Sequence, residues 1–186
     1  MNKKAKETEG LQVGDSVPDF RAEDQFGRTF TLSEALKKGP LVLVFYRGRW
    51  CPICNSHLKK LENGLSSIGA KGANVVAISP ETAEYLKKTA QKTKASFPLL
   101  HDKNYAISDL FELTFRPGFM ERAMYNTILG AQLKKAHSDD SQRLPIPATY
   151  IVNTDRTIVW RHFNPDYKKR SSVQEILNHI PDKVSG

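Results

Sequence analysis

The chain has 186 residues and a net charge of +8 at neutral pH. This length predicts a single domain whose hydrophobic core needs no disulfide staples. The basic residues are spread out, including the run 168–170, and no recognition helix or interleaved aromatics accompany them. We therefore expect solvated basic faces and no nucleic-acid partner. No apolar run approaches the roughly 18 residues of a membrane span, so no membrane contact is expected.

The N-terminal residues and the number of cysteines indicate the compartment in which the protein works. Residues 1–12 are mostly polar and predict a flexible tail ahead of one domain over residues 13–186. This tail carries charge without an apolar segment, so it does not resemble a signal peptide. Two cysteines are too few for a stapled secreted scaffold and suit redox chemistry in a reducing compartment. We expect a cytoplasmic protein.

Strands and helices alternate along the chain. The apolar run at 41–46 predicts a strand buried on both faces, and a long helix follows from Pro52. The other expected elements are a hairpin of strands at 19–22 and 28–31, a short helix at 33–38, a strand at 74–79, a helix to about 94, an extended piece at 97–101, a helix at 104–113, a hairpin at 148–153 and 157–162, and a helix from 172. This order predicts an α/β fold with a parallel core.

Residues 115–143 fit this alternation least well. They contain a breaker, one helical pattern and a polar loop. We interpret the segment as an insertion that could cover the cysteines, with an ordinary surface helix and loop as the alternative.

Both cysteines lie where the buried strand gives way to the helix. Pro52 suits the first helical position, which places Cys51 at the N-cap beside free backbone N–H groups. The helix dipole and the cations of Arg47 and Arg49 favour a thiolate there. Cys54 follows one helical turn later, close enough to capture what forms on Cys51. The pair therefore predicts an attacking thiol, Cys51, and a resolving thiol, Cys54.

Two other interpretations of the cysteines stay open. The thiols could be reduced and inert, or they could bind zinc, because His57 extends the spacing to Cys-x2-Cys-x2-His. A structural zinc ion needs four ligands, and the other histidines are scattered. We therefore expect His57 on the helix surface, and neither a metal nor a cofactor. The non-enzymatic alternative is a binding module with structural or zinc-bound cysteines.

Three stretches of the chain resemble a known family. Residues 13–20 are similar to the opening of the alkyl hydroperoxide reductase/thiol-specific antioxidant family, the peroxiredoxins. Residues 45–54 and 146–152 resemble its peroxiredoxin-like branch, and the match covers roughly residues 11–182. The resemblance implies a thioredoxin-like fold: a central mixed sheet flanked by helices, an N-terminal β-hairpin, and an insertion before the strand that follows a cis proline.

The resemblance also assigns roles to individual residues. It implies that Cys51 occupies the peroxidatic, or nucleophilic, position. It implies that Pro147 is the cis proline facing the cysteines, and that the backbone of Ile146 is presented to an extended substrate strand. Trp50 is expected to pack beside the sulfur and to limit water.

One motif departs from the family. Peroxiredoxins carry Pro-x3-Thr/Ser-x2-Cys, but Val44 and Gly48 stand at the proline and hydroxyl positions here. The family's partner arginine falls near Pro147. The candidate replacements are Arg47, Arg49, Arg116 and Arg143. The Trp-Cys-Pro-x-Cys pattern is closer to a thioredoxin-type disulfide exchanger.

We therefore expect a thiol-dependent oxidoreductase with a CxxC dithiol. Its expected substrate is a peroxide, and its expected reductant is thioredoxin or another dithiol. The alternative substrate is a protein or small-molecule disulfide. The expected substrate-binding residues are Trp50, Arg47, Arg49, Ile146 and Pro147, and the chain could form a homodimer.

Overall fold

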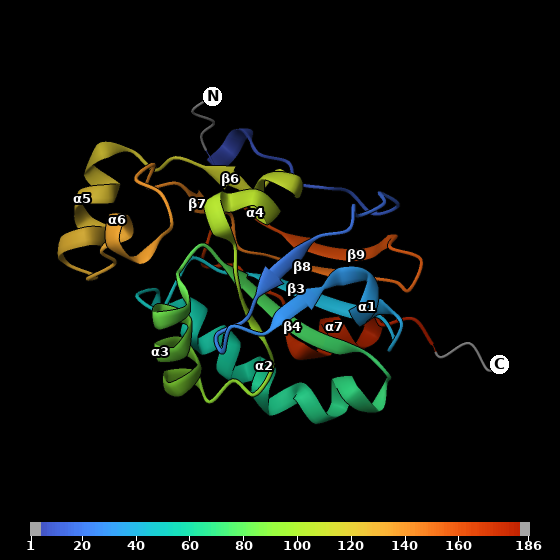
Figure 1. The fold of residues 1–186 in the computed structure, drawn as a ribbon. Helices are drawn as coiled ribbons and strands as arrows, with labels where there is room; N and C mark the ends of the chain where they lie inside the picture. The colour runs from blue at the N-terminus through green and yellow to red at the C-terminus, as the bar shows by residue number, and fades with distance from the viewer. Residues whose placement is uncertain (1–4, 183–186) are drawn as a thin grey trace.

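The computed structural model describes residues 5–182, which are built around a five-stranded sheet (Figure 1). Its strands are β3 (Leu41–Phe45), β4 (Asn74–Ser79), β5 (Leu99–His101), β8 (Ala148–Val152) and β9 (Ile158–Phe163). Their order in the sheet is β5-β4-β3-β8-β9. The pairs β3–β4 and β4–β5 are parallel, whereas β3–β8 and β8–β9 are antiparallel. The predicted α/β fold with a central mixed sheet is confirmed.

Strand β3 is buried on both faces, as its apolar run predicts. Val42 and Val44 point to one face of the sheet, and Leu41, Leu43 and Phe45 point to the other. All five side chains are at most 1% exposed. This alternation follows from the two-residue period of a strand, and it explains why no polar residue interrupts the run.

Helices cover both faces of the sheet (Figure 1). The face of Val42 is covered by α2 (Pro52–Ala70), α3 (Ala83–Thr93) and α7 (Val173–His179). The opposite face is covered by α1 (Leu32–Leu36), α4 (Ala106–Leu110) and the hairpin of β1 (Arg21–Glu23) and β2 (Thr29–Thr31). Short 3-10 turns are η1 (Ala5–Glu7) and η2 (Lys103–Tyr105). No helix in residues 5–182 is long and apolar enough to cross a membrane.

Residues 115–143, which fit the strand–helix alternation least well, form an insertion that lies outside the central sheet. Strands β6 (Thr114–Phe115) and β7 (Leu144–Pro145) pair at its base, where they bring its two ends together. Between them lie α5 (Phe119–Thr127) and α6 (Leu133–Ala136), which form a separate lobe at one end of the molecule (Figure 1).

The N-terminal segment is more ordered than the sequence indicates. Thr8 is 3% exposed, and the backbone N–H of Leu11 donates to the carbonyl of Phe111 at 3.2 Å. Arg161 Nη1 donates to the carbonyls of Glu9 at 2.7 Å and Leu11 at 2.8 Å. The expectation of a flexible tail over residues 1–12 is therefore wrong for 8–12, because these contacts come from distant parts of the chain. Residues 1–4 lie outside the described residues.

Candidate active site

The two cysteines lie together at the start of α2. Cys51 is the N-cap and Pro52 the first helical residue, as predicted. The backbone N–H of Cys54 donates to Cys51 Sγ at 3.4 Å. The sulfurs of Cys51 and Cys54 lie 2.6 Å apart, at hydrogen-bond distance, and neither cysteine is in a disulfide. The helix turn thus holds one sulfur against the other, as a dithiol that can close to a disulfide requires.

The inserted segment 115–143 lies over the loop that carries the dithiol. Cys51 and Cys54 are only 2% and 1% exposed. Trp50, 5% exposed, packs its ring against Tyr125 of α5, with 5.0 Å between ring centroids. The segment 115–143 therefore covers the loop that carries the cysteines.

Arg47 is buried within the same cover. Its Cζ lies 4.6 Å from the ring centroids of both Trp50 and Tyr125, and 4.4 Å from that of Tyr167. The residue is 2% exposed, and its Nε has no hydrogen-bond partner among residues 5–182. Aromatic faces attract a cation, so the three rings hold this positive charge in the interior near the cysteines.

Arg49 serves the site through its backbone. Its N–H donates to Glu81 Oε2 at 2.9 Å, and its carbonyl accepts from Asn55 Nδ2 at 2.7 Å. Its side chain instead reaches the carbonyl of Gly130 at 3.4 Å and lies over the ring of Tyr85. The expectation that the Arg49 side chain binds at the sulfurs is not supported by these contacts.

A different arginine contacts the dithiol. Arg170, in the segment before α7, donates from Nη2 to Cys54 Sγ at 3.3 Å. Sequence reasoning missed it, because a basic run such as 168–170 is typical of a solvated face. Of the candidates named from the sequence, Arg143 instead pairs with Asp109 at 3.0 Å. No local signal distinguishes Arg170, since the contact spans 116 positions.

The two thiols titrate as a pair because their sulfurs are in direct contact. Burial raises the pKa of Cys54, but the hydrogen bond with Cys51 and the charge of Arg170 outweigh it and lower the pKa to about 6. The hydrogen bond with Cys54, together with burial, raises the pKa of Cys51. In this closed arrangement the negative charge therefore favours Cys54. The low pKa predicted for Cys51 is not found in this arrangement, because the hydrogen bond with Cys54 and burial outweigh the charge of Arg47.

Glu81 explains why the family's hydroxyl is missing. It is fully buried, and burial raises its pKa to about 8, so the carboxyl is protonated at neutral pH. Gly48 has φ of +150°, and a Cβ there would lie 2.6 Å from Glu81 Oε1 and 2.7 Å from Trp50 Nε1. Neither of these two polar atoms has a hydrogen-bond partner among residues 5–182. Position 48 therefore excludes a threonine or serine side chain in this packing.

The expectation about the proline loop is wrong. The Ile146–Pro147 bond is trans, since none of the described peptide bonds is cis. An X-Pro bond is trans unless its surroundings favour the cis form, and the resemblance alone supplied that expectation. Ile146 is fully buried, and its N–H donates to the carbonyl of Leu113 at 2.8 Å. That N–H is therefore unavailable to a substrate strand.

His57 is buried and does not lie on the helix surface as expected. It is 6% exposed, and its Nε2 lies 3.4 Å from Ser171 Oγ. Burial lowers its pKa to about 3, so the ring is neutral. Within residues 5–182, no group of three or more His, Cys, Asp and Glu side chains could hold a metal ion.

Comparisons with known proteins agree with this geometry. The model of the AhpC/TSA family matches residues 13–161. The chain is 30% identical to peroxiredoxin Bcp of Escherichia coli K12 over 173 residues, which is 92% of this chain and 97% of that protein. The thiol-disulfide oxidoreductase ResA of Oceanobacillus iheyensis is 28% identical over 107 residues, 55% of each chain. The structure of peroxidoxin BcpB of Mycobacterium tuberculosis aligns with a TM-score of 0.71 at 22% identity, covering 91% of this chain and 96% of that one.

The family match and the dithiol support the same conclusion. The matched residues 13–161 include both cysteines and four whole strands of the central sheet, β3, β4, β5 and β8. The relative from Escherichia coli is matched along nearly its whole length. These findings confirm the resemblance to peroxiredoxins: the chain belongs to the AhpC/TSA family and is a thiol-dependent oxidoreductase.

Proposed function

We propose that the protein reduces peroxides, with Cys51 as the attacking thiolate and Cys54 as the resolving thiol. The observation that carries this proposal is the contact of 2.6 Å between the two sulfurs at the N-cap of α2. A resolving thiol in contact with the attacking one can trap an oxidised sulfur without rearrangement of the helix.

The chemistry proceeds in three balanced steps. The Cys51 thiolate attacks one peroxide oxygen, the O–O bond breaks, and the other oxygen takes up a proton and leaves as water or an alcohol. Cys51 is then a sulfenic acid, and the sulfur of Cys54 attacks it to form a disulfide and release water. Two thiol groups of a reductant restore the dithiol and become a disulfide themselves.

The attack requires that the negative charge move to Cys51. In the closed arrangement the charge favours Cys54, because Arg170 donates to that sulfur. Transfer of one proton from Cys51 to Cys54 across the contact leaves the thiolate on Cys51. There the backbone N–H of Cys54 can stabilise it.

We assign substrate binding at the dithiol to Trp50 and Arg47, which both pack against Tyr125 of α5. The reductant that fits best is a thioredoxin-type dithiol protein. An apolar face on α5 supports a protein partner: Phe119, Met120 and Ile128 are about four-fifths exposed, at 78%, 83% and 79%. This face lies on the helix that also carries Tyr125.

Disulfide exchange is the second candidate. Gly48 and Val44 supply neither the hydroxyl nor the proline of the peroxiredoxin motif, and a hydroxyl side chain does not fit at position 48. A thiol-disulfide oxidoreductase, ResA, is among the relatives. A peroxide needs a donor to orient it, whereas a disulfide substrate depends mainly on an accessible thiolate.

The test measures consumption of hydrogen peroxide and of an insulin-type disulfide in parallel, each with a thioredoxin regenerating system. We expect faster turnover with peroxide. Cys51→Ser should abolish it, and Cys54→Ser should stop after one turnover with a sulfenic acid that a dimedone probe labels. Faster turnover with the disulfide would favour the second candidate, and equal turnover in both variants would contradict the assigned roles.

A further inference from the structure

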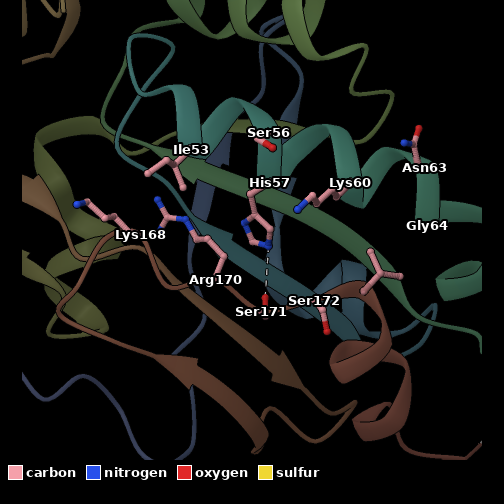
Figure 2. A pocket seen from close by; sticks show the side chains of 11 residues that line it. Ile53, Ser56, His57, Lys60, Asn63, Gly64, Lys168, Arg170, Ser171 and Ser172 are labelled. Carbon is pink, nitrogen blue, oxygen red and sulfur yellow. Dashed lines mark hydrogen bonds between the residues drawn. The ribbon is translucent and has the colours of Figure 1, made fainter.

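A cavity of 630 Å³ lies between α2 and the segment before α7 (Figure 2). Its volume is within the range of small-molecule sites. Eight of its eleven lining residues have polar side chains: Ser56, His57, Lys60, Asn63, Lys168, Arg170, Ser171 and Ser172. The others are Ile53, Val173 and the glycine at 64. The cavity lies beside the dithiol, because its lining includes Ile53, next to Cys54 in the chain, and Arg170, which contacts the Cys54 sulfur.

The lining contains three cations and no carboxylate. The cations are Lys60 on α2 and Lys168 and Arg170 on the segment before α7 (Figure 2). None of them forms an ion pair with a residue in 5–182. Converging positive charges without a counterion raise the local potential and attract an anion.

The carboxylates next to the cavity have other partners. Glu175 accepts from the backbone N–H and the hydroxyl of Ser172, at 2.7 and 2.8 Å. Glu62 accepts from the backbone N–H and the hydroxyl of Ser96, both at 2.8 Å. Neither carboxylate forms an ion pair with Lys60, Lys168 or Arg170, so no salt bridge among residues 5–182 occupies these cations.

Arg170 connects the cavity to the dithiol. Arg170 is one of the lining residues, and its Nη2 donates to Cys54 Sγ at 3.3 Å. Its Nε and Nη1 have no hydrogen-bond partner among the described residues. Among residues 5–182, the sulfur of Cys54 is thus the hydrogen-bond acceptor of a side chain that can donate several hydrogen bonds.

We propose that this cavity binds a small organic anion with a phosphate or carboxylate group, and that Arg170 couples its binding to the redox state of the cysteines. The coupling rests on the proposed function insofar as the dithiol must close to a disulfide. In the dithiol form, the Cys54 thiolate and the ligand compete for Arg170. The disulfide carries no charge, so Arg170 is then free to bind the ligand.

The coupling has a direction that can be measured. The anion should bind the disulfide form more tightly than the dithiol form, by roughly fivefold or more for a typical coupling between sites. By reciprocity, the bound anion should stabilise the disulfide against reduction by the same factor. Cys54→Ser removes the thiolate and should bind the anion as tightly as the disulfide form does.

The experiment titrates inorganic phosphate and citrate into the full chain by calorimetry, in both redox forms. The double variant Lys60→Ala/Lys168→Ala removes two lining cations. The matched control, Lys59→Ala/Lys169→Ala, removes the same charge from exposed neighbouring positions that do not line the cavity. We expect roughly tenfold weaker binding in the first and less than twofold change in the control. The probe that binds with the higher affinity, inorganic phosphate or citrate, identifies the ligand group as a phosphate or a carboxylate.

The possible failures are distinguishable. Equal losses in both double variants would mean that general charge attracts the probe, which overturns the site. Equal affinity of the two redox forms would overturn the coupling through Arg170. If peroxide and diamide both fail to form the disulfide, the proposed function fails, while binding to the dithiol form still decides whether the cavity is an anion site.

Discussion

Arg170 Nη2 lies 3.3 Å from Cys54 Sγ, although 116 positions separate the two residues in the chain. The contact exists because α7, which follows Arg170 directly, packs against α2, which carries Cys54. A cation at this distance favours the thiolate over the thiol. The electrostatics of the dithiol therefore depend on the packing of two helices, and four variants test the surroundings of the site.

Replacing Arg170 should make the dithiol harder to ionise. With Arg170→Gln, Cys54 loses a charge that helps to lower its pKa to about 6, and this pKa should rise by roughly one unit or more. The thiolate fraction at neutral pH and the rate of alkylation should both fall. The pH dependence of alkylation by iodoacetamide measures this shift. The control is Lys169→Gln, an exposed neighbour whose loss should leave the profile unchanged.

Replacing Glu81 should change how stability depends on pH. Burial raises the pKa of Glu81 from 4.5 to about 8, so the folded state keeps a proton that the unfolded chain has lost. The contribution of Glu81 to the free energy of unfolding is fully present below the pKa that this group has in the unfolded chain. It falls as pH rises toward 8, by up to about 1.4 kcal/mol per pH unit. In Glu81→Gln this decline should disappear.

Thermal unfolding of the wild type and Glu81→Gln across this pH window measures the difference. The difference between the two proteins reports the titration of Glu81 together with its electrostatic coupling to Cys54, whereas His57 contributes equally to both. Parallel curves for the two proteins would show that Glu81 is ionised in the folded state.

Restoring the family's hydroxyl should fail. Gly48→Thr places a Cβ within 2.7 Å of two buried polar atoms, at a φ of +150° that side chains rarely adopt. We expect a loss of stability of about 1–3 kcal/mol from backbone strain alone, and no gain in peroxide turnover. The control is Gly69→Ala in α2, where a Cβ meets nothing within 4 Å. This change should raise the free energy of unfolding by roughly 0.5–1 kcal/mol. Denaturant unfolding measures the stability of both variants, and peroxidase assays measure their turnover. Faster turnover in Gly48→Thr would contradict the packing argument.

Removing the aromatic cover should expose the dithiol. Tyr125→Ala deletes the ring that packs on Trp50, so alkylation of the cysteines should become faster. The same change should lower stability by up to about 3–5 kcal/mol, because Tyr125 is 6% exposed. Mass spectrometry of the alkylated cysteines follows the rate.

Two controls separate a local opening from global unfolding. Phe119→Ala removes an exposed ring from the same helix, α5, and should change neither property. Phe111→Ala destabilises the core on the opposite face of the sheet and reports alkylation through unfolding alone. If Tyr125→Ala reacts no faster than Phe111→Ala at equal stability, the ring is not a cover.

Local features of the sequence determine the elements and the place of the chemistry. The apolar run of β3, the proline at the first helical position and the spacing of the cysteines each act within a few residues. Backbone and capping preferences fix such geometry locally, so these residues alone suffice to assign Cys51 to the N-cap. The capping box of Ser172 and Glu175 at α7 is another case of this kind.

The tertiary structure alone decides what surrounds the sulfurs. Arg170, Glu81 and Tyr125 reach the site from elements far apart in the chain, and no local pattern distinguishes them from solvated residues. The same limit explains the errors over the proline bond at 147 and the packed residues 8–12, which depend on partners across the fold. Sequence thus determines where a helix can hold a thiol, whereas the packing of distant elements determines which charge lies beside it and which sulfur becomes the anion.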